Sequence, residues 1–246
     1  MITFYDLATI LPETTVSINT WKTRYSLNYK QIPYKTEWVE GPDVESVCKK
    51  MGIPPSSKRP DGSDFYSLPA IYDDSTNTGV SDSLVIAAYL DKTYPDKPTL
   101  IPTGTEALHA AFVDAFMSKT GLFFGHFAPS ALKLMYPSTA DHFIRSWSSL
   151  LGKPFFDIVP VGAEREAGWK QIEADLTAVD GWYQKNGGGP FIMGDTPSFA
   201  DFIVGGLLGL GNAVSHDNPE WSSVLEWNNG RWRKLGEALE KYARVV

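Results

Sequence analysis

Residues 68–94 read LPAIYDDSTNTGVSDSLVIAAYLDKTY, and this stretch decides the fold that the sequence predicts. It contains a β-prone run at residues 69–72, a turn signal at residues 77–79 and a helical pattern over residues 81–94. The apolar face of that helix is formed by Leu84, Ala87, Ala88 and Leu90. Strand, turn, strand and helix in this order predict the second half of a small α/β domain.

The residues before this stretch supply the first half of the same domain. An apolar strand is predicted at residues 2–7, a helix at 17–30 and a second strand at 34–40, which together form a parallel crossover unit. A short helix is predicted at residues 43–51. The loop of residues 52–68 is long for a compact domain, so we expect it to form one rim of a cleft.

The residues after this stretch have a different pattern. PDKPTLIPTGT at residues 95–105 holds three prolines and no periodicity, which is typical of an interdomain linker. Helical periodicity follows, most clearly over residues 164–185 and 231–242, and residues 202–214 predict a buried helix. We therefore expect an α/β domain over residues 1–95, a linker over 96–105 and an all-helical domain over 106–246.

Composition excludes several classes of protein. The 246 residues include 22 basic and 29 acidic side chains, which gives a net charge of −7. No run of Lys or Arg is present that could bind nucleic acid. No signal peptide is apparent at the start, and residues 202–214 are too short to span a membrane, which needs roughly 20 apolar residues. We expect an intracellular, cytoplasmic protein that binds neither nucleic acid nor membrane.

Cysteine and histidine usage argues against a metal site. Cys48 is the only cysteine, which excludes an intramolecular disulfide or CxxC motif, and its apolar spacing predicts a structural role. The four histidines are scattered, with no HxxxH or HxH pair. No P-loop and no GxSxG motif is present, so nucleotide-binding and serine-hydrolase functions have no support.

Three features of the first domain have both a structural and a functional interpretation. Ser17 begins a helix, where it either only caps the helix or donates a hydrogen bond to an anion such as a thiolate. Leu68-Pro69 is either an ordinary strand entry or a cis bond that exposes the Leu68 backbone to an extended peptide. Asp82 and Ser83 open the next helix, where capping by Ser81 competes with binding of a charged amino-acid head group.

Together these motifs resemble those of the glutathione transferases, over essentially the whole chain. The resemblance rests on SINTWKTRY at residues 17–25, LPAI at 68–71, DSLVIAAYL at 82–90 and TPSFAD at 196–201. Within the family, the first of these and the insert before Leu68 resemble the fungal FuA class, which is related to bacterial β-etherases. The resemblance implies a thioredoxin-like domain followed by a helical bundle, a homodimer, and glutathione as co-substrate in detoxification.

The resemblance also assigns residues to the two halves of the site. Ser17 takes the position of the catalytic residue, with Asn19 and Thr20 able to assist the thiolate. Glutathione is expected at Leu68 and Pro69 for its cysteinyl part and at Asp82 and Ser83 for its γ-glutamyl end. Residues 40–43 read EGPD, without the lysine that related classes use for the glycyl carboxylate, so Lys58 or Lys22 is expected to replace it.

The second domain is expected to supply the site for the electrophile. Candidates from the aromatic-rich run are Phe123, Phe124, His126 and Tyr136, which either stack on an aryl ligand or simply pack in the core. A serine at position 17 cannot form a mixed disulfide, so conjugation or peroxide chemistry is favoured over thiol transfer.

Three functions are therefore weighed. The first is a glutathione transferase (EC 2.5.1.18 type) acting on aromatic electrophiles. The second is a ligandin-type binder of aromatic plant-derived compounds such as polyphenols. The third is a non-catalytic scaffold domain, against which the presence of Ser17, Asp82 and Ser83 argues.

Overall fold

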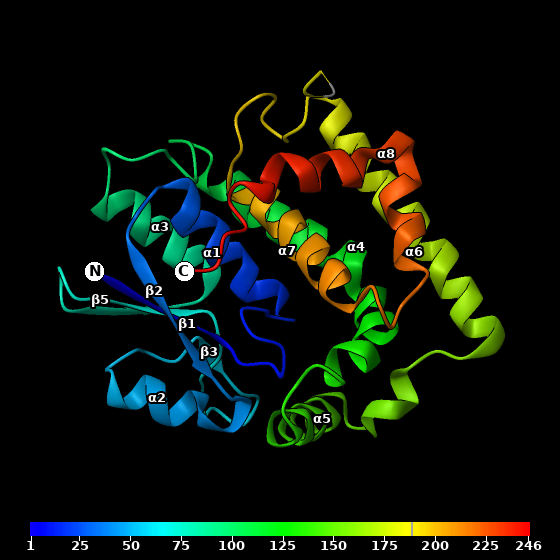
Figure 1. Ribbon diagram of the computed structural model, residues 1–246, viewed down its shortest axis with the longest axis horizontal. Helices are drawn as coiled ribbons and strands as arrows, with labels where there is room; N and C mark the ends of the chain where they lie inside the picture. The colour runs from blue at the N-terminus through cyan, green and yellow to red at the C-terminus, as the bar shows by residue number, and fades with distance from the viewer. Residues whose placement is uncertain (188) are drawn as a thin grey trace.

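The first part of the chain folds around a mixed β-sheet, as expected. The computed structural model describes residues 1–187 and 189–246 (Figure 1). The elements of this part are β1 (Ile2–Leu7), α1 (Ile18–Tyr29), β2 (Tyr34–Val39), a 3-10 turn at Gly41–Asp43, α2 (Val44–Lys50), β3 (Ser57–Lys58), β4 (Asp64–Phe65), β5 (Ala70–Asp73), β6 (Thr78–Ser81) and α3 (Ser83–Thr93). The strand order is β2-β1-β5-β6, with β1 parallel to β2 and antiparallel to β5. The parallel crossover unit is thus confirmed.

Alternation along β1 explains why helices cover both faces of this sheet. Ile2 and Phe4 belong to the large core that includes residues of α1 and α3, whereas Tyr5 belongs to a smaller cluster with Val44 and Cys48 of α2. Successive side chains of a strand point to opposite faces, so one strand supplies both layers. Figure 1 shows α1 and α3 on one side of the strands and α2 on the other. This is the thioredoxin-like arrangement that the sequence predicts.

Two details of this domain differ from the expectation. The chain turns at residues 74–77, so Gly79 lies inside β6 rather than in the turn. A Cβ atom at Gly79 would lie 2.8 Å from the Cα atom of Ile53, so this glycine permits a close approach of the loop after α2. The expected loop of residues 52–68 also contains a small antiparallel hairpin, in which Ser57 pairs with Phe65.

The second part of the chain is helical in all its regular elements within the described residues. It consists of α4 (Glu106–Leu132), α5 (Pro137–Leu151), a 3-10 turn at Phe155–Ile158, α6 (Gly162–Gln184), α7 (Phe199–Val214) and α8 (Trp221–Glu240). Non-helical backbone at residues 227–230 divides α8, and its second half begins at Arg231 as predicted. No helix in residues 1–187 and 189–246 has the length and apolar character needed to cross a membrane.

Helix α7 is the buried helix that the apolar run predicts, and it lies at the centre of the molecule (Figure 1). Its N-terminus is closed by a capping box, in which the Ser198 N–H donates to Asp201 at 2.8 Å. The two-domain architecture of α/β followed by all-α is confirmed. The boundaries at residues 95 and 105 stay a prediction.

Glycines allow α7 to approach α1 closely. A Cβ atom at Gly206 would overlap the carbonyl oxygen of Ile18, and one at Gly209 would lie 2.7 Å from Nε1 of Trp21. Ile18 is the first residue of α1, so this contact holds the start of α1 against the helical domain.

A buried ion pair anchors the same helix to the sheet. Arg24 of α1 donates to Asp6 of β1 at 2.7 Å, and both side chains are fully buried. Arg24 also donates to Thr36 and stacks over the rings of Phe4 and Trp38. A buried charge needs such a set of partners, because removing it from water is costly.

Cys48 has the structural position that its spacing predicts. Its side chain is 1% exposed in the cluster on the α2 face of the sheet, and burial raises the pKa of its thiol to about 11. A buried thiol with a raised pKa is a poor nucleophile, because only the thiolate reacts.

The contact at Gly206 predicts a loss of stability on substitution. Gly206→Ala places a methyl group against the Ile18 backbone, so α1 and α7 must separate, at a cost of about 1–3 kcal/mol. Gly181→Ala in α6 is the matched control, because a Cβ atom there has no neighbour within 4 Å; the helix propensity of alanine is expected to stabilise it by about 0.5–1 kcal/mol. Denaturant unfolding measures both, and equal stability of the two variants would contradict the packing role of Gly206.

The burial of Cys48 predicts slow reaction with a thiol reagent. A pKa of about 11 leaves about one thiol in a thousand ionised at pH 8, so reaction is expected to be about 100-fold slower than in the unfolded chain. The rate of release of a chromophoric thiol from an aromatic disulfide, with and without guanidinium, measures the ratio. Native and unfolded rates within a factor of about three would show that the thiol is accessible.

Candidate functional site

Ser17 is the N-cap of α1, at the end of the loop that connects β1 to α1. The loop is anchored to the helical domain by a hydrogen bond from the Ile10 N–H to the Leu134 carbonyl at 2.9 Å. Ser17 has extended backbone angles, and its Oγ atom accepts a hydrogen bond from the Thr20 N–H at 3.3 Å. The capping interpretation is therefore correct, and it uses only the acceptor capacity of the hydroxyl.

The hydrogen bonds around Ser17 show which hydroxyl groups donate to a neighbour in the protein. The buried Thr20 hydroxyl donates to the Ser17 carbonyl at 3.2 Å, so the proton in its 3.2 Å contact with Thr15 comes from Thr15. Thr15 in turn accepts from the Ser17 N–H at 3.2 Å. Among the described residues, no acceptor engages the Ser17 proton, so this hydroxyl can donate to a ligand. Thr20 instead holds the cap in place.

Asn19 is the second residue of α1 and places a second polar side chain near Ser17. Its side chain is exposed, and its Oδ1 atom accepts a hydrogen bond from the buried Lys22 ammonium at 2.8 Å. Ile18 and Asn19 also lie in the first turn, where backbone N–H groups have no helical partner and the helix dipole favours an anion. The start of α1 therefore concentrates hydrogen-bond donors.

Leu68 stands at the entry to β5, and the Leu68-Pro69 bond is cis. No hydrogen bond of the described residues engages the N–H or the C=O of Leu68. These two groups are positioned to pair with an extended peptide backbone in the manner of strand addition.

Asp82, rather than Ser81, is the N-cap of α3. Its Oδ1 atom accepts from the Leu84 and Val85 N–H groups at 2.9 and 3.1 Å, while Ser81 ends β6 and donates to the Pro54 carbonyl. Asp82 has φ 74° and ψ 131°, a conformation that costs an L residue about 1–3 kcal/mol. Asp82 is exposed, and no hydrogen bond of the described residues uses its Oδ2 atom, which leaves an acceptor for an ammonium. Ser83 is 8% exposed, and with the first N–H groups of α3 it offers donors for a carboxylate.

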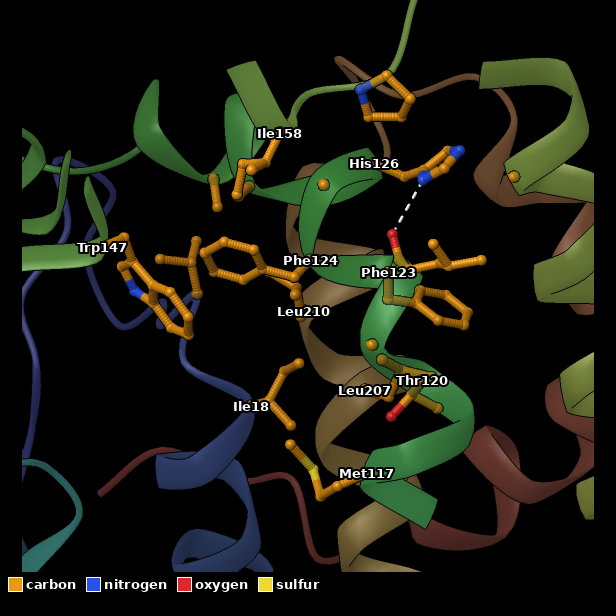
Figure 2. Close-up of a pocket in the computed structure, with 18 of the residues that line it drawn as sticks. Ile18, Met117, Thr120, Phe123, Phe124, His126, Trp147, Ile158, Leu207 and Leu210 are labelled. Carbon is orange, nitrogen blue, oxygen red and sulfur yellow. Dashed lines mark hydrogen bonds between the residues drawn. The ribbon is translucent and has the colours of Figure 1, made fainter. Parts of the chain in front are cut away.

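A cavity of about 890 Å³ begins at Ser17 and extends into the helical domain. Its lining is mostly apolar and aromatic, and it includes Phe123 and Phe124 of α4. Figure 2 shows the Phe124 ring directed toward Trp147, with Ile18 and Met117 at the other end of the cavity. The Phe124 and Trp147 ring centroids are 4.1 Å apart, close enough to stack. A cavity of this kind suits a planar apolar ligand.

His126 borders the cavity, and each of its ring nitrogens faces a backbone carbonyl, to one of which a neutral ring donates its single N–H. Nδ1 lies 2.9 Å from the Leu122 carbonyl and Nε2 lies 3.2 Å from the Arg165 carbonyl (Figure 2 shows the former). The ring is 2% exposed, and Gly168 leaves room for it, since a Cβ atom there would lie 2.6 Å from the imidazole. His126 therefore forms part of the wall.

Five predicted site residues line the cavity, and seven lie outside its lining: Thr20, Leu68, Pro69, Asp82, Ser83, Lys58 and Tyr136. Tyr136 is the N-cap of α5 and is 40% exposed, while its neighbour Met135 lines the cavity. Lys58 lies in the hairpin of residues 57–65, where its exposed ammonium pairs with Asp64.

Several lining residues were not foreseen from the sequence. Leu207 and Leu210 come from α7, and Trp147 comes from α5. The spacing of Phe143 and Trp147, four residues apart on one amphipathic helix, is a signal that could have indicated the aromatic wall.

Comparisons with known proteins agree with this geometry. The family model described as the glutathione S-transferase N-terminal domain matches residues 16–93, and the one described as the C-terminal domain matches residues 107–242. A glutathione S-transferase-like protein of Aspergillus flavus is 30% identical over 253 residues, which cover 96% of this chain and 88% of that protein.

Solved structures of fungal proteins are similar along the whole chain. A glutathione S-transferase of Ceriporiopsis subvermispora, solved in complex with glutathione, is 40% identical with a TM-score of 0.93, covering 100% of this chain and 98% of that one. Glutathione transferase FuA3 from Phanerochaete chrysosporium is 36% identical with a TM-score of 0.91, again covering 100% and 98%. The resemblance to this class is confirmed, and the chain belongs to the glutathione S-transferase family.

Proposed function

We propose that this protein is a serine-type glutathione transferase that conjugates glutathione to aromatic or other hydrophobic electrophiles, with a role in detoxification. The observation that carries the proposal is the Ser17 hydroxyl, whose proton has no acceptor among the described residues and which borders a mostly apolar cavity of about 890 Å³. A donor at the edge of an apolar cavity is the arrangement that a thiolate nucleophile needs, because its charge is stabilised on one side and its target binds on the other.

Glutathione would bind along the first domain. The exposed carboxylate oxygen of Asp82 would accept from the γ-glutamyl ammonium, while Ser83 and the start of α3 would hold the adjoining carboxylate. The backbone of Leu68, beside Pro69, would pair with the cysteinyl part. Lys58 stays our proposed partner for the glycyl carboxylate. The Lys58 ammonium pairs with Asp64 in this structure, so the glycyl carboxylate would compete with Asp64 for that ammonium. That a Ceriporiopsis relative of 40% identity was solved in complex with glutathione supports glutathione as the co-substrate.

The chemical step follows from the groups at the start of α1. The thiol loses its proton to water, and the thiolate accepts hydrogen bonds from the Ser17 hydroxyl and the Asn19 amide, while Thr20 holds Ser17 in place. The sulfur then attacks the electrophilic carbon; a C–S bond forms, and a leaving group such as chloride departs with its bonding electrons. Phe123, Phe124 and the wall formed by His126 would hold the aryl ring, with Tyr136 at the entrance.

A ligandin function is the second candidate, and the aromatic wall favours it. Phe124 contacts Trp147, Phe143 and Phe155, so one end of the cavity offers several ring faces to a polyphenol. In this case the protein would bind aromatic compounds with little turnover.

Homodimerisation and a cytoplasmic location are implied by the family resemblance, and both stay predictions. Sedimentation of the purified chain measures the first.

The role of Ser17 predicts a selective loss of turnover on its substitution. Ser17→Ala removes the donor to the thiolate, so turnover of a chlorinated dinitrobenzene is expected to fall about 100-fold or more. Glutathione affinity, measured by calorimetry, is expected to stay within about threefold, because Leu68, Asp82 and Ser83 are unchanged.

Ser222→Ala, at an exposed serine of α8, is the matched control and is expected to leave turnover unchanged. Unchanged turnover in Ser17→Ala would instead assign thiolate activation to Asn19, Thr20 or Thr15.

The aromatic wall predicts competition between ligands and electrophiles. A polyphenol is expected to bind with micromolar affinity and to inhibit turnover competitively with the aryl substrate, and Phe124→Ala is expected to weaken this binding about tenfold by removing a stacking surface. Fluorescence titration and inhibition kinetics measure the two effects. Absence of binding would contradict the ligandin function and leave the transferase function standing.

A further inference from the structure

Lys22 is a buried ammonium group beside the proposed thiolate site. It lies on α1, its residue is 4% exposed, and its Nζ atom donates to the Asn19 Oδ1 atom at 2.8 Å. Within residues 1–187 and 189–246, Asn19 is the one hydrogen-bond partner of this ammonium. Burial lowers the pKa of Lys22 to about 8, and the negative charge of Asp82 opposes that decrease.

The contact determines which way the Asn19 amide faces. An ammonium group only donates, so the atom that faces Lys22 must be the amide oxygen, and the NH₂ group points away from Lys22. Asn19 is exposed and lines the cavity next to Ser17. Lys22 therefore keeps two N–H donors of Asn19 available on the side where a ligand can reach them.

We propose that Lys22 is a positioning residue for the thiolate: it fixes the Asn19 side chain so that the amide N–H groups, together with the Ser17 hydroxyl, donate to the glutathione sulfur. This inference rests on the proposed transferase function. It adds a residue that does not touch the sulfur itself and acts through Asn19.

A purely structural role does not explain Lys22 as well. The other fully buried cation of the same helix, Arg24, has a carboxylate, a hydroxyl and two aromatic rings as partners. Lys22 has one neutral amide, which compensates poorly for the loss of water around a charge. An apolar side chain of the same length would fill the space at lower cost, so the ammonium is explained by what it does to Asn19.

The electrostatic surroundings also separate this role from direct binding of glutathione. The negative charge of Asp82, at the proposed γ-glutamyl end, raises the pKa of Lys22 against the effect of burial. Lys22 lies on α1 and donates to Asn19 beside Ser17, whereas Lys58, proposed for the glycyl carboxylate, lies in the β3–β4 hairpin. We therefore expect Lys22 to influence the sulfur and not the affinity for the peptide.

The test is the pKa of the bound glutathione thiol, read from the ultraviolet absorbance of the thiolate as a function of pH. Lys22→Met is expected to raise this pKa by about one unit and to lower turnover near pH 6.5 about tenfold. Glutathione affinity is expected to change by less than about threefold. Lys22→Gln, which keeps an N–H donor without the charge, is expected to recover part of the loss.

A double-mutant cycle separates action through Asn19 from action by charge alone. Asn19→Ala is expected to raise the thiol pKa as Lys22→Met does, and the double variant is expected to show no further increase. Three results would each overturn the inference. The thiol pKa is unchanged in Lys22→Met, or Lys22→Met raises the thiol pKa just as much when Asn19→Ala is already present. The third is a glutathione affinity that Lys22→Met reduces more than about tenfold.

Two controls keep the outcome interpretable. Thermal unfolding is expected to show Lys22→Met at least as stable as the parent, because a poorly paired buried charge is removed; if it does not fold, Lys22→Gln and Asn19→Ala supply the same comparison. If the parent protein itself shows no thiolate absorbance on binding glutathione, the proposed function fails. A thiolate in the parent with the same pKa in the variants overturns only the role of Lys22.

Discussion

The close approach of α7 to the first turn of α1 is the contact on which the candidate site depends. Gly206 lets the backbone of Ile18 lie against α7, and Ile18 directly follows the cap residue Ser17. The same helix supplies Leu207 and Leu210 to the cavity wall. One buried helix therefore sets the distance between the hydroxyl in the first domain and the apolar wall in the second. A side chain at Gly206 would change both the packing and the geometry of the site.

Charge is used sparingly around this site, and its placement explains how an acidic protein can bind an anionic peptide. The net charge is −7, so no general positive field attracts glutathione. In the proposed function, attraction would come from groups that are close to the ligand: the first turns of α1 and α3, the Ser17 and Ser83 hydroxyls and the Lys58 ammonium. The buried Arg24 contributes little, because its charge is neutralised by Asp6 at 2.7 Å.

The sequence predicts those parts of this structure that depend on local patterns. Alternation along residues 2–7 and helical spacing over residues 164–185 are local, and both elements lie where they were expected. The cap of α3 was predicted less well: Ser81 and Asp82 are equally good capping residues by propensity. Pairing of β6 with β5 extends through Ser81, so Asp82 takes the cap at a positive φ. The spacing of Phe143 and Trp147 indicates an aromatic face on α5, but it does not show that this face meets Phe124, because that contact depends on how α5 packs against α4.

The identity of the residue at position 17 decides which thiol can be the nucleophile. A cysteine at a helix N-terminus would itself ionise, because the dipole lowers its pKa, and it would form a mixed disulfide with glutathione. A serine stays protonated and can only donate, so the negative charge must reside on the bound ligand. The single cysteine of the chain, Cys48, has its pKa raised to about 11 by burial on the far side of the sheet. At neutral pH the protein therefore has no competing thiolate of its own, and in the proposed function the thiolate would be supplied by the ligand alone.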